Sequence, residues 1–286
     1  MTAYLDHKDL ANETIDEARA REIADGVARV RERLAAAAQK AGRAPDEVAL
    51  LAATKTRDVG EIMAAIDAGV RVIGENRPQE IQIKAPGLTC LCAERGFALG
   101  AAGGASSSDD AADSADAQAR PQASARIPFH LIGQLQTNKI NKILPYADVV
   151  ESVDSPNLAE RIATRALRDG RDVGVLLEVN ESGEESKSGC DPDKALDYAY
   201  RIAATQGVRL VGLMTIGAHV DDESVIRRGF AHLRGLRDTI AASGEAGTGA
   251  CRELSMGMTG DVTFAVEEGS TIVRVGTGIF GARAFI

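Results

Sequence analysis

The chain has 286 residues, of which 44% are hydrophobic, and a formal net charge of −9. This length suits one large folded domain, since α/β barrels often reach about 250 residues as a single domain. The acidic balance, an aromatic content of 3% and the lack of tryptophan argue against nucleic-acid binding, which needs a basic surface and stacking side chains. No apolar stretch approaches the roughly 20 residues of a membrane span, and residues 1–10 lack the hydrophobic core of a signal peptide. We therefore expect a cytoplasmic protein without a membrane partner.

The four cysteines suggest neither a disulfide framework nor a metal site. They do not form two CxxC pairs, and no histidine stands beside them at zinc-ligand spacing. We expect reduced thiols and no bound metal at Cys90, Cys92, Cys190 and Cys251.

The first periodic segment predicts a long leading helix. Between Ile15 and Ala41, apolar residues recur at the spacing of one helix face, and Gly42 follows as a C-terminal stop. After this helix, short apolar runs alternate with helical segments. The runs predict eight strands, at Val48–Thr54, Val72–Glu75, Phe129–Ile132, Val149–Ser152, Val173–Asn180, Leu210–Ile216, Glu253–Met256 and Ile272–Val275. The segments between them predict helices near Val59–Ala68, Arg77–Lys84, Asn138–Tyr146, Pro156–Arg168, Pro192–Thr205, Asp222–Ala242 and Asp261–Glu267.

This alternation predicts the fold class. Near-continuous apolar strands separated by helices indicate parallel pairing with both faces of the sheet buried. Eight such units close a (β/α)8 TIM barrel. We therefore expect residues 1–286 to form a single barrel domain with an extra N-terminal helix; an open doubly wound sheet is the alternative.

One segment interrupts the alternation. From about residue 89 to residue 125 the chain is dominated by Ala, Gly, Ser and Asp. Such a composition cannot bury enough apolar area to offset the entropy of ordering it. We expect a disordered insertion at about 89–125, between the second and third strands, which serves as a tolerated linker; a role in binding a partner is the alternative.

Lys55 is the most informative single residue. It follows the apolar run Leu50–Ala53, where a buried strand should end and a functional loop begin. Partial desolvation lowers the pKa of an amine and leaves a larger neutral fraction that can attack a carbonyl group, as Schiff-base formation requires. The alternative is a lysine that ends the strand and extends into solvent.

Functional side chains of barrels gather at the C-terminal ends of the strands. The predicted ends carry Lys55, Glu75-Asn76, His130 with Gly133-Gln134, Asn180, Met214-Thr215, Ser255-Met256-Gly257 and Arg274 to Thr277. Barrel enzymes often bind phosphate through the loops after strands seven and eight, where glycines let backbone N–H groups approach closely. We expect this role for Ser255, Gly257, Gly276 and Thr277. Ordinary tight turns are the alternative.

The segment Gly276–Gly281 also matches the dinucleotide fingerprint GxGxxG. That fingerprint needs a following helix, a second strand and an acidic residue about 20 positions later. Only five residues follow Gly281, so we do not expect a nucleotide fold here.

A lysine suited to Schiff-base formation, a phosphate-binding pair of loops and a nearby arginine together suggest pyridoxal 5′-phosphate (PLP) as the cofactor. Lys55 would bond the aldehyde, and Arg274 would face the pyridine nitrogen. Because a guanidinium group only donates hydrogen bonds, it favours an unprotonated ring nitrogen and a weaker electron sink.

Seven motifs in order carry a family resemblance. They are Leu51-Ala-Ala-Thr-Lys-Thr56, Gly74-Glu-Asn76, His130-Leu-Ile-Gly-Gln-Leu-Gln-Thr-Asn-Lys139, Ser186-Lys-Ser-Gly189, Gly212-Leu-Met214, Leu254-Ser-Met-Gly-Met-Thr-Gly-Asp261 and Val273-Arg-Val-Gly-Thr-Gly-Ile-Phe-Gly281. The chain resembles the pyridoxal phosphate homeostasis proteins of the YggS/PROSC type, over all but the insertion and the extreme N-terminus.

The resemblance implies a fold-type III barrel like the N-terminal domain of alanine racemase, with PLP on Lys55. It implies that Ser255, Gly276 and Thr277 hold the phosphate, that Arg274 meets the ring nitrogen, and that Asn76 and Met214 lie near the cofactor. Family members are thought to buffer and deliver PLP. We accordingly expect PLP-dependent apoenzymes as partners, and a monomer or weak dimer.

Two enzyme classes are the alternatives to a carrier. The first is an amino-acid racemase or another fold-type III PLP enzyme, and the second is an unrelated Schiff-base barrel such as an aldolase. Racemisation needs a proton donor and acceptor on opposite faces of the substrate, and Lys55 serves one face. The chain ends at Ile286, just after the eighth predicted strand, so we expect no C-terminal β-domain and no robust catalytic activity.

Some matched residues depart from the family pattern or have open roles. Thr54 and Thr259 stand where the family more often has serine, and both retain a hydroxyl. His130 is expected to be a hydrogen-bonded core residue, with a catalytic base as the alternative. Asn138 is a candidate helix cap. Lys139 and Lys187 are either solvated charges or anion ligands at the barrel mouth.

Overall fold

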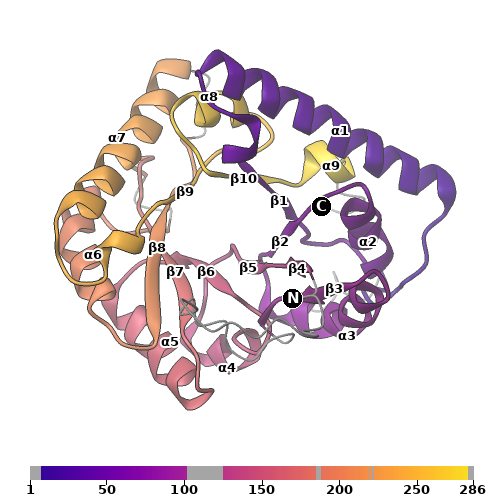
Figure 1. Ribbon diagram of the computed structural model, residues 1–286, viewed down its shortest axis with the longest axis horizontal. Helices are drawn as coiled ribbons and strands as arrows, with labels where there is room; N and C mark the ends of the chain where they lie inside the picture. The colour runs from indigo at the N-terminus through magenta and orange to yellow at the C-terminus, as the bar shows by residue number, and fades with distance from the viewer. Residues whose placement is uncertain (1–7, 102–124, 185–187, 219, 221, 283–286) are drawn as a thin grey trace, which may run out of the picture.

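A closed barrel of eight parallel strands forms the centre of the molecule. The computed structural model describes residues 8–101, 125–184, 188–218, 220 and 222–282. The barrel strands are β1 (Ala49–Ala53), β2 (Val72–Glu75), β5 (Phe129–Leu131), β6 (Val149–Val153), β7 (Val173–Glu178), β8 (Val208–Met214), β9 (Glu253–Ser255) and β10 (Ile272–Val275). They pair in the order β1-β10-β9-β8-β7-β6-β5-β2, and β2 closes on β1 (Figure 1). The TIM-barrel prediction is confirmed, and each strand lies within two residues of its predicted bounds.

Helices form a ring outside the strands (Figure 1). They are α1 (Glu17–Lys40), α2 (Val59–Asp67), α3 (Pro78–Glu94), α4 (Ile140–Ile143), α5 (Pro156–Arg168), α6 (Ala195–Ala203), α7 (Glu223–Ala242), α8 (Val262–Glu267) and α9 (Thr277–Phe280). Short 3₁₀ turns cover Pro45–Glu47, Thr137–Lys139, Pro192–Lys194 and Thr248–Ala250. Because helices cover its outside, a strand such as β7 is buried at all six positions, which explains its continuous apolar run.

The leading helix α1 belongs to the barrel wall rather than to a separate unit. Its Asp16 side chain accepts a hydrogen bond from the backbone N–H of Arg19, which caps its first turn. The helix packs on α2, α8 and α9. A Cβ atom at Gly26 would lie 2.4 Å from the carbonyl oxygen of Ile279, so this close approach to α9 requires glycine. The match to GxGxxG is therefore a strand end followed by a short helix that packs on α1.

The predicted insertion starts later than residue 89. Helix α3 continues to Glu94, nearly three turns beyond its predicted end at Lys84, because Leu88 and Cys92 extend its buried face. Strands β3 (Phe97–Leu99) and β4 (Ala125–Ile127) then pair in parallel as a small two-stranded sheet. The prediction of disorder over 89–99 is wrong because these residues pack on the barrel; the remainder, 102–124, lies outside the described residues.

The helix predicted at Asn138–Tyr146 is shorter in the structure. It consists of the 3₁₀ turn Thr137–Lys139 and the four-residue α4. Lys139, not Asn138, occupies the N-cap position of α4, and no side chain caps it. The predicted capping role of Asn138 is wrong.

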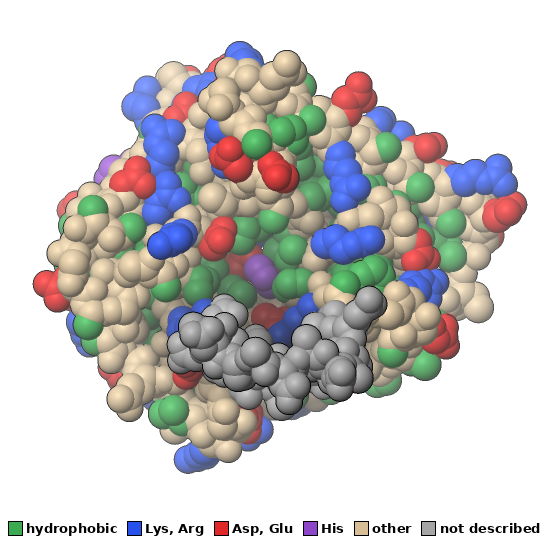
Figure 2. All heavy atoms as spheres, viewed as in Figure 1, with side chains coloured by type: hydrophobic (Ala, Val, Ile, Leu, Met, Phe, Trp, Pro, Cys, Tyr) green, Lys and Arg blue, Asp and Glu red, His purple; other side chains and the backbone are tan. Residues whose placement is uncertain are grey.

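The face of the barrel seen in Figure 1 is hollowed at its centre. Hydrophobic side chains surround the hollow, a histidine is visible within it, and charged side chains follow the outer rim (Figure 2).

No helix in the described ranges has both the length and the apolar content to span a membrane. The cysteines are free thiols, and burial raises the pKa of Cys92 to about 11 and those of Cys190 and Cys251 to about 12.

Candidate functional site

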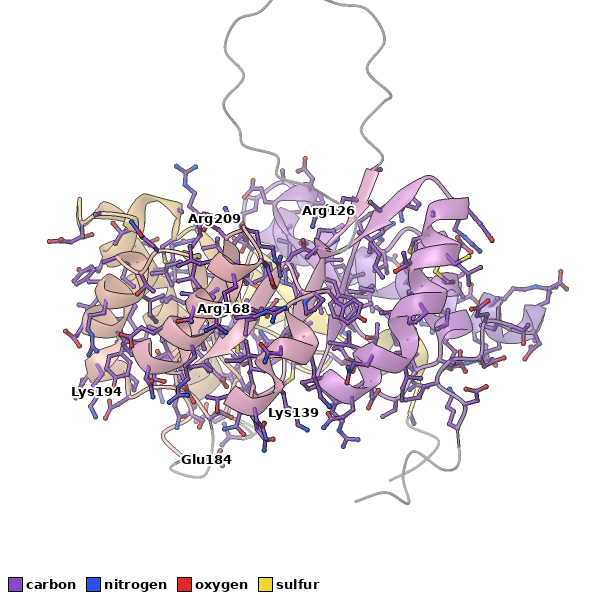
Figure 3. All side chains as sticks on the ribbon, turned by 90° about the horizontal axis from the view of Figure 1, so that it is seen from below. Arg126, Lys139, Arg168, Glu184, Lys194 and Arg209 are labelled. Carbon is purple, nitrogen blue, oxygen red and sulfur yellow. The ribbon has the colours of Figure 1, made fainter. Side chains whose placement is uncertain are left out.

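The C-terminal strand ends point to one side of the molecule. Lys139 and Glu184 follow β5 and β7, and Figure 3 shows them on the side opposite to Arg126 and Arg209, which stand before or near the start of β5 and β8. Lys55 follows β1 and is half-buried, as expected for an amine at a strand end that faces a functional loop. The structure thus places Lys55 at the end of the barrel where sequence reasoning expected it.

A fully buried lysine holds the backbone before Lys55. The Nζ atom of Lys84 donates to the carbonyl oxygen of Thr54 at 2.9 Å, to Glu75 Oε2 at 2.7 Å and to Glu80 Oε2 at 2.8 Å. Lys84 is 1% exposed. The hydroxyl of Thr54 also donates to Glu75 Oε2, at 3.0 Å. One cation and two carboxylates therefore form a buried cluster beneath Lys55.

The same cluster holds the backbone after Lys55. Glu80 Oε2 accepts a hydrogen bond from the backbone N–H of Thr56 at 2.7 Å. Thr56 has a φ of 67°, a left-handed conformation that threonine rarely adopts. The Glu80 bond stabilises this turn, so Lys55 lies between two anchored neighbours.

The charge of Lys84 favours the ionised form of the carboxyl groups in this cluster. Burial raises the pKa of Glu75, while the charge of Lys84 acts in the opposite direction. Sequence reasoning missed the Lys84–Glu75–Glu80 cluster. A signal was present, because Glu80 and Lys84 stand four residues apart on a predicted helix that follows Glu75 directly.

A second group of hydrogen-bonded polar side chains crosses the barrel interior. His130 Nδ1 lies 2.6 Å from Glu151 Oε1, and the Ser255 hydroxyl donates to Glu151 Oε2 at 2.6 Å. Arg274 donates to that hydroxyl at 2.6 Å, to the carbonyl oxygen of Ser255 at 2.7 Å and to that of Thr215 at 2.8 Å. The bonds from His130 and Ser255 lower the pKa of Glu151 although burial acts in the opposite direction. His130 is thus the hydrogen-bonded core residue that was expected.

These hydrogen bonds bear on the phosphate-binding role that was predicted for Ser255. Its side chain is fully buried, and its hydroxyl already donates to Glu151 and accepts from Arg274. A phosphate ligand would have to displace one of these charged partners. In this structure Ser255 orients Arg274.

The hydroxyl groups near the mouth come instead from Thr259 and Thr277. Their Oγ1 atoms lie 3.1 Å apart, and the backbone N–H of Gly278 donates to Thr259 Oγ1 at 3.2 Å. The preceding turn requires Gly257, which has a φ of 94° and whose added Cβ would lie 2.4 Å from the Ala265 side chain. Gly276 and Thr277 therefore lie where they were expected, and Thr259 joins them.

Asn76 follows β2 and Met214 ends β8, two strands on opposite sides of the barrel. The Oδ1 atom of Asn76 is buried and has no hydrogen-bond partner among the described residues. A buried amide oxygen without a partner is costly, and the side-chain amide can equally present its NH₂ group to a ligand. Met214 is buried and pairs in register with Glu178 and Ser255.

Glu178 is a second residue that sequence reasoning missed. It ends β7, is 3% exposed, and burial raises the pKa of its carboxyl to about 7. The charge of Arg274 acts in the opposite direction, and that of Asp154 in the same direction. No local signal marks Glu178, because a glutamate at the end of an apolar run is indistinguishable from one that turns to solvent.

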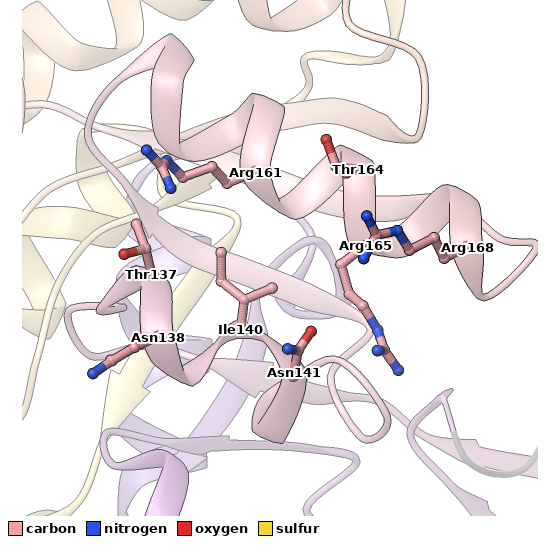
Figure 4. Close-up of a pocket in the computed structure, with 8 residues that line it drawn as sticks. All are labelled: Thr137, Asn138, Ile140, Asn141, Arg161, Thr164, Arg165 and Arg168. Atoms are coloured by element: carbon pink, nitrogen blue, oxygen red, sulfur yellow. The ribbon is translucent and has the colours of Figure 1, made fainter.

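The remaining candidates lie elsewhere or beyond the described residues. The Asn138 side chain lines a groove on the outside of the barrel (Figure 4). Lys139 is half-buried in the 3₁₀ turn after β5. Lys187 lies outside the described residues, so its expected roles are not tested.

Known proteins resemble this chain over most of its length. The model of the alanine racemase N-terminal domain family matches residues 27–284. The pyridoxal phosphate homeostasis protein of Aquifex aeolicus is 33% identical over 259 residues, which cover 91% of this chain and 97% of that protein. The protein of the same name from Escherichia coli K12 is 34% identical over 269 residues, which cover 92% and 98%.

Solved structures agree with these relatives. An unknown protein from Bifidobacterium adolescentis is 64% identical, with a TM-score of 0.87, and covers 96% of this chain and 100% of that one. PipY of Synechococcus elongatus with PLP bound is 30% identical, with a TM-score of 0.68 and coverage of 91% and 100%. Alanine racemase of Clostridium difficile shares the fold at 11% identity, with a TM-score of 0.63 and coverage of 94% and 61%. The chain belongs to the pyridoxal phosphate homeostasis protein family, within the alanine racemase N-terminal domain fold.

Proposed function

We propose that this chain binds pyridoxal 5′-phosphate at the C-terminal end of its barrel, and that it buffers and delivers this cofactor. PLP supplies an aldehyde that condenses with a primary amine, and a ring that withdraws electrons from the bonded carbon. The observation that carries the proposal is the anchoring of half-buried Lys55 between Thr54 and Thr56. The names of the relatives and the PLP-bound PipY structure support it.

The surrounding residues fit such a ligand. Thr259, Thr277 and the loop backbone at Gly276 offer hydroxyl and N–H groups, which a phosphate group with several acceptor oxygens requires. The unpartnered amide of Asn76 would complete its hydrogen bonding with a polar group of the cofactor. Phosphate binding is thus assigned to Thr259, Gly276 and Thr277, with Ser255 removed from this role.

Arg274 is assigned to the ring nitrogen. Its guanidinium is buried and oriented by the carbonyl oxygens of Ser255 and Thr215. Since it only donates hydrogen bonds, it favours an acceptor, which the unprotonated nitrogen is. Glu151 and Ser255 hold Arg274 in this orientation.

The pairing of Arg274 with the ring nitrogen supports a carrier function. Arg274 favours a ring nitrogen that withdraws electrons weakly, which suits storage better than carbanion chemistry. The proposal also includes delivery of PLP to PLP-dependent apoenzymes and the absence of robust catalysis. It further includes a cytoplasmic location and action as a monomer or weak dimer.

Reductive trapping tests the proposal directly. Purified protein incubated with PLP should absorb visible light, and borohydride reduction should leave one covalent adduct, which peptide mass spectrometry should locate on Lys55. Lys55→Ala should abolish that adduct, while Lys142→Ala on the exposed surface of α4 should retain it. An adduct on another lysine in the unsubstituted protein would reject the assignment of Lys55.

A further inference from the structure

A polar groove lies on the outside of the barrel, between α5 and the segment from Thr137 to α4 (Figure 4). Its volume is about 350 Å³, which falls within the range of small-ligand sites. The groove is lined by Thr137, Asn138, Ile140, Asn141, Arg161, Thr164, Arg165 and Arg168. Three of these eight residues are arginines and none is acidic, although the chain as a whole carries a net charge of −9.

The three arginines form a row along one face of α5. They stand at i, i+4 and i+7, a spacing that places side chains on the same side of a helix. With a rise of about 1.5 Å per residue, the row from Arg161 to Arg168 spans about 10 Å. Leu158, Ile162 and Ala166 on the adjoining face are buried against the barrel. The row is therefore fixed to a packed helix and faces outward.

Two of the guanidinium groups are oriented through their Nε atoms. Arg161 Nε donates to Asn157 Oδ1 at 3.3 Å, and Arg165 Nε donates to Asp169 Oδ2 at 3.0 Å. These bonds leave the terminal nitrogens of both groups available as two-pronged donors, the geometry that binds phosphate oxygens. Among the described residues, neither Arg161 nor Arg168 forms an ion pair with a carboxylate.

The opposite wall adds neutral donors. The side chains of Thr137, Asn138 and Asn141 form no hydrogen bond with another described residue. Ile140, which is buried, forms the apolar part of the lining. No aromatic side chain lines the groove, so it offers no surface on which a nucleotide base would stack. The ligand must be recognised through its anionic groups.

We propose that this groove binds the di- or triphosphate group of a small phosphorylated ligand. Several oxyanions spread along about 10 Å match a row of three guanidinium groups better than a single carboxylate or orthophosphate does. The site is separate from the barrel interior and does not rest on the proposed cofactor. Arg161 and Arg168 are its principal ligands, and Arg165, partly neutralised by Asp169, contributes less.

Calorimetric titration with inorganic tripolyphosphate tests this site. The full-length protein is first saturated with PLP, so that any phosphate site in the barrel mouth is occupied. We expect saturable binding with a stoichiometry of one, and binding of orthophosphate that is weaker by about tenfold or more. Arg161→Gln and Arg168→Gln should each weaken tripolyphosphate binding by about fivefold to tenfold, since each removes a charge-assisted hydrogen-bonding group.

Two controls separate this site from its alternatives. Arg29→Gln removes an exposed positive charge on α1, which lies on the other side of the barrel from α5 (Figure 1), and it should leave the affinity within about twofold because salt screens exposed charges across the molecule. Thr277→Val alters only the barrel mouth and should also leave it unchanged. Equal weakening by Arg29→Gln would show a general electrostatic effect, and weakening by Thr277→Val would place the anion in the barrel. Either result, or the absence of saturable binding up to about millimolar tripolyphosphate, would overturn the proposal.

Discussion

Lys84 and Thr54 are joined by a buried hydrogen bond of 2.9 Å, in which an ammonium group on α3 holds the carbonyl oxygen of the residue before Lys55. Thr54 and Lys84 stand 30 positions apart in the chain. Because Lys84 also binds Glu75 and Glu80, and Glu80 holds the N–H of Thr56, the turn that carries Lys55 depends on this one cation.

Replacing Lys84 should therefore affect both stability and the position of Lys55. Lys84→Met leaves two buried carboxylates without their cation, which typically costs about 3–5 kcal/mol of unfolding free energy. Urea unfolding measures this loss. Lys142→Met, an exposed substitution on α4, should change stability by less than about 0.5 kcal/mol.

A purely structural role for Lys84 would lower stability alone. We expect Lys84→Met, under conditions where it is fully folded, also to bind PLP more weakly by about tenfold or more, because the turn around Lys55 loses its anchor. Unchanged affinity in the folded variant would show that Lys84 does not position Lys55.

If Thr277 binds the phosphate and Ser255 does not, substitutions of these two residues should affect ligand binding differently. Thr277→Val removes a hydroxyl that faces the mouth, and it should weaken PLP binding by about tenfold while leaving the binding of pyridoxal, which lacks the phosphate, unchanged. Ser255→Ala should instead weaken both ligands and lower stability by about 1–3 kcal/mol, since it leaves Glu151 and Arg274 without a shared partner. Equilibrium titrations followed by absorbance give both comparisons. A phosphate-selective loss in Ser255→Ala would restore the assignment made from sequence.

Glu178 should make stability fall as the pH rises. Its carboxyl has a pKa of about 7 in the folded protein against an ordinary value of 4.5, so between these values the folded state keeps a proton that the unfolded state has lost. Stability is therefore greatest below about pH 4.5 for this group and decreases by about 2–3 kcal/mol up to pH 7, with no further change above it. Glu178→Gln should remove this dependence and be more stable than the unsubstituted protein at pH 8 by about 2 kcal/mol.

Urea unfolding at a series of pH values measures the effect of Glu178. Glu245→Gln, an exposed carboxyl between α7 and the 3₁₀ turn Thr248–Ala250, is the matched control and should leave the pH profile unchanged. Parallel profiles for Glu178→Gln and the unsubstituted protein would show that the Glu178 carboxyl is ionised in the folded state.

The segment 102–124 should be dispensable. Its composition predicts little packing, and loop-closure entropy changes by only about 0.6 kcal/mol for each doubling of loop length. The replacement must still connect two parallel strands, so a linker of about eight Gly and Ser residues is needed to run from the end of β3 to the start of β4. Thermal melting should shift by a few degrees at most, with PLP binding retained. A large decrease in melting temperature, or loss of PLP, would show that the segment contributes to the fold.

Carrier and enzyme differ in turnover. Racemisation needs proton donors on both faces of a substrate, and Lys55 serves one. With alanine or serine and the PLP-saturated protein, we expect turnover far below about 1 s⁻¹, the lower end of the usual enzyme range. A rate of that order or above that disappears in Lys55→Ala would establish the racemase instead.

The sequence by itself determined the barrel and the position of Lys55. Strand–helix alternation is a local property, because each apolar run needs burial on both faces and each helical stretch needs one buried side. All eight strands follow from it, and so does the placement of Lys55, Asn76 and Gly276 at strand ends. Family motifs added the cofactor, since their order along the chain is also readable without coordinates.

Only the tertiary structure decided which polar groups meet. Ser255 and Glu151 stand 104 positions apart and are joined by a hydrogen bond, and Thr259 and Thr277 form another across 18 positions. The burial of Lys84 and the raised pKa of Glu178 depend equally on which elements cover them. The extension of α3 and the parallel pairing of β3 with β4 have the same origin. Hydrogen bonds and desolvation act at short distances in space, and the spacing of residues along the chain does not report those distances.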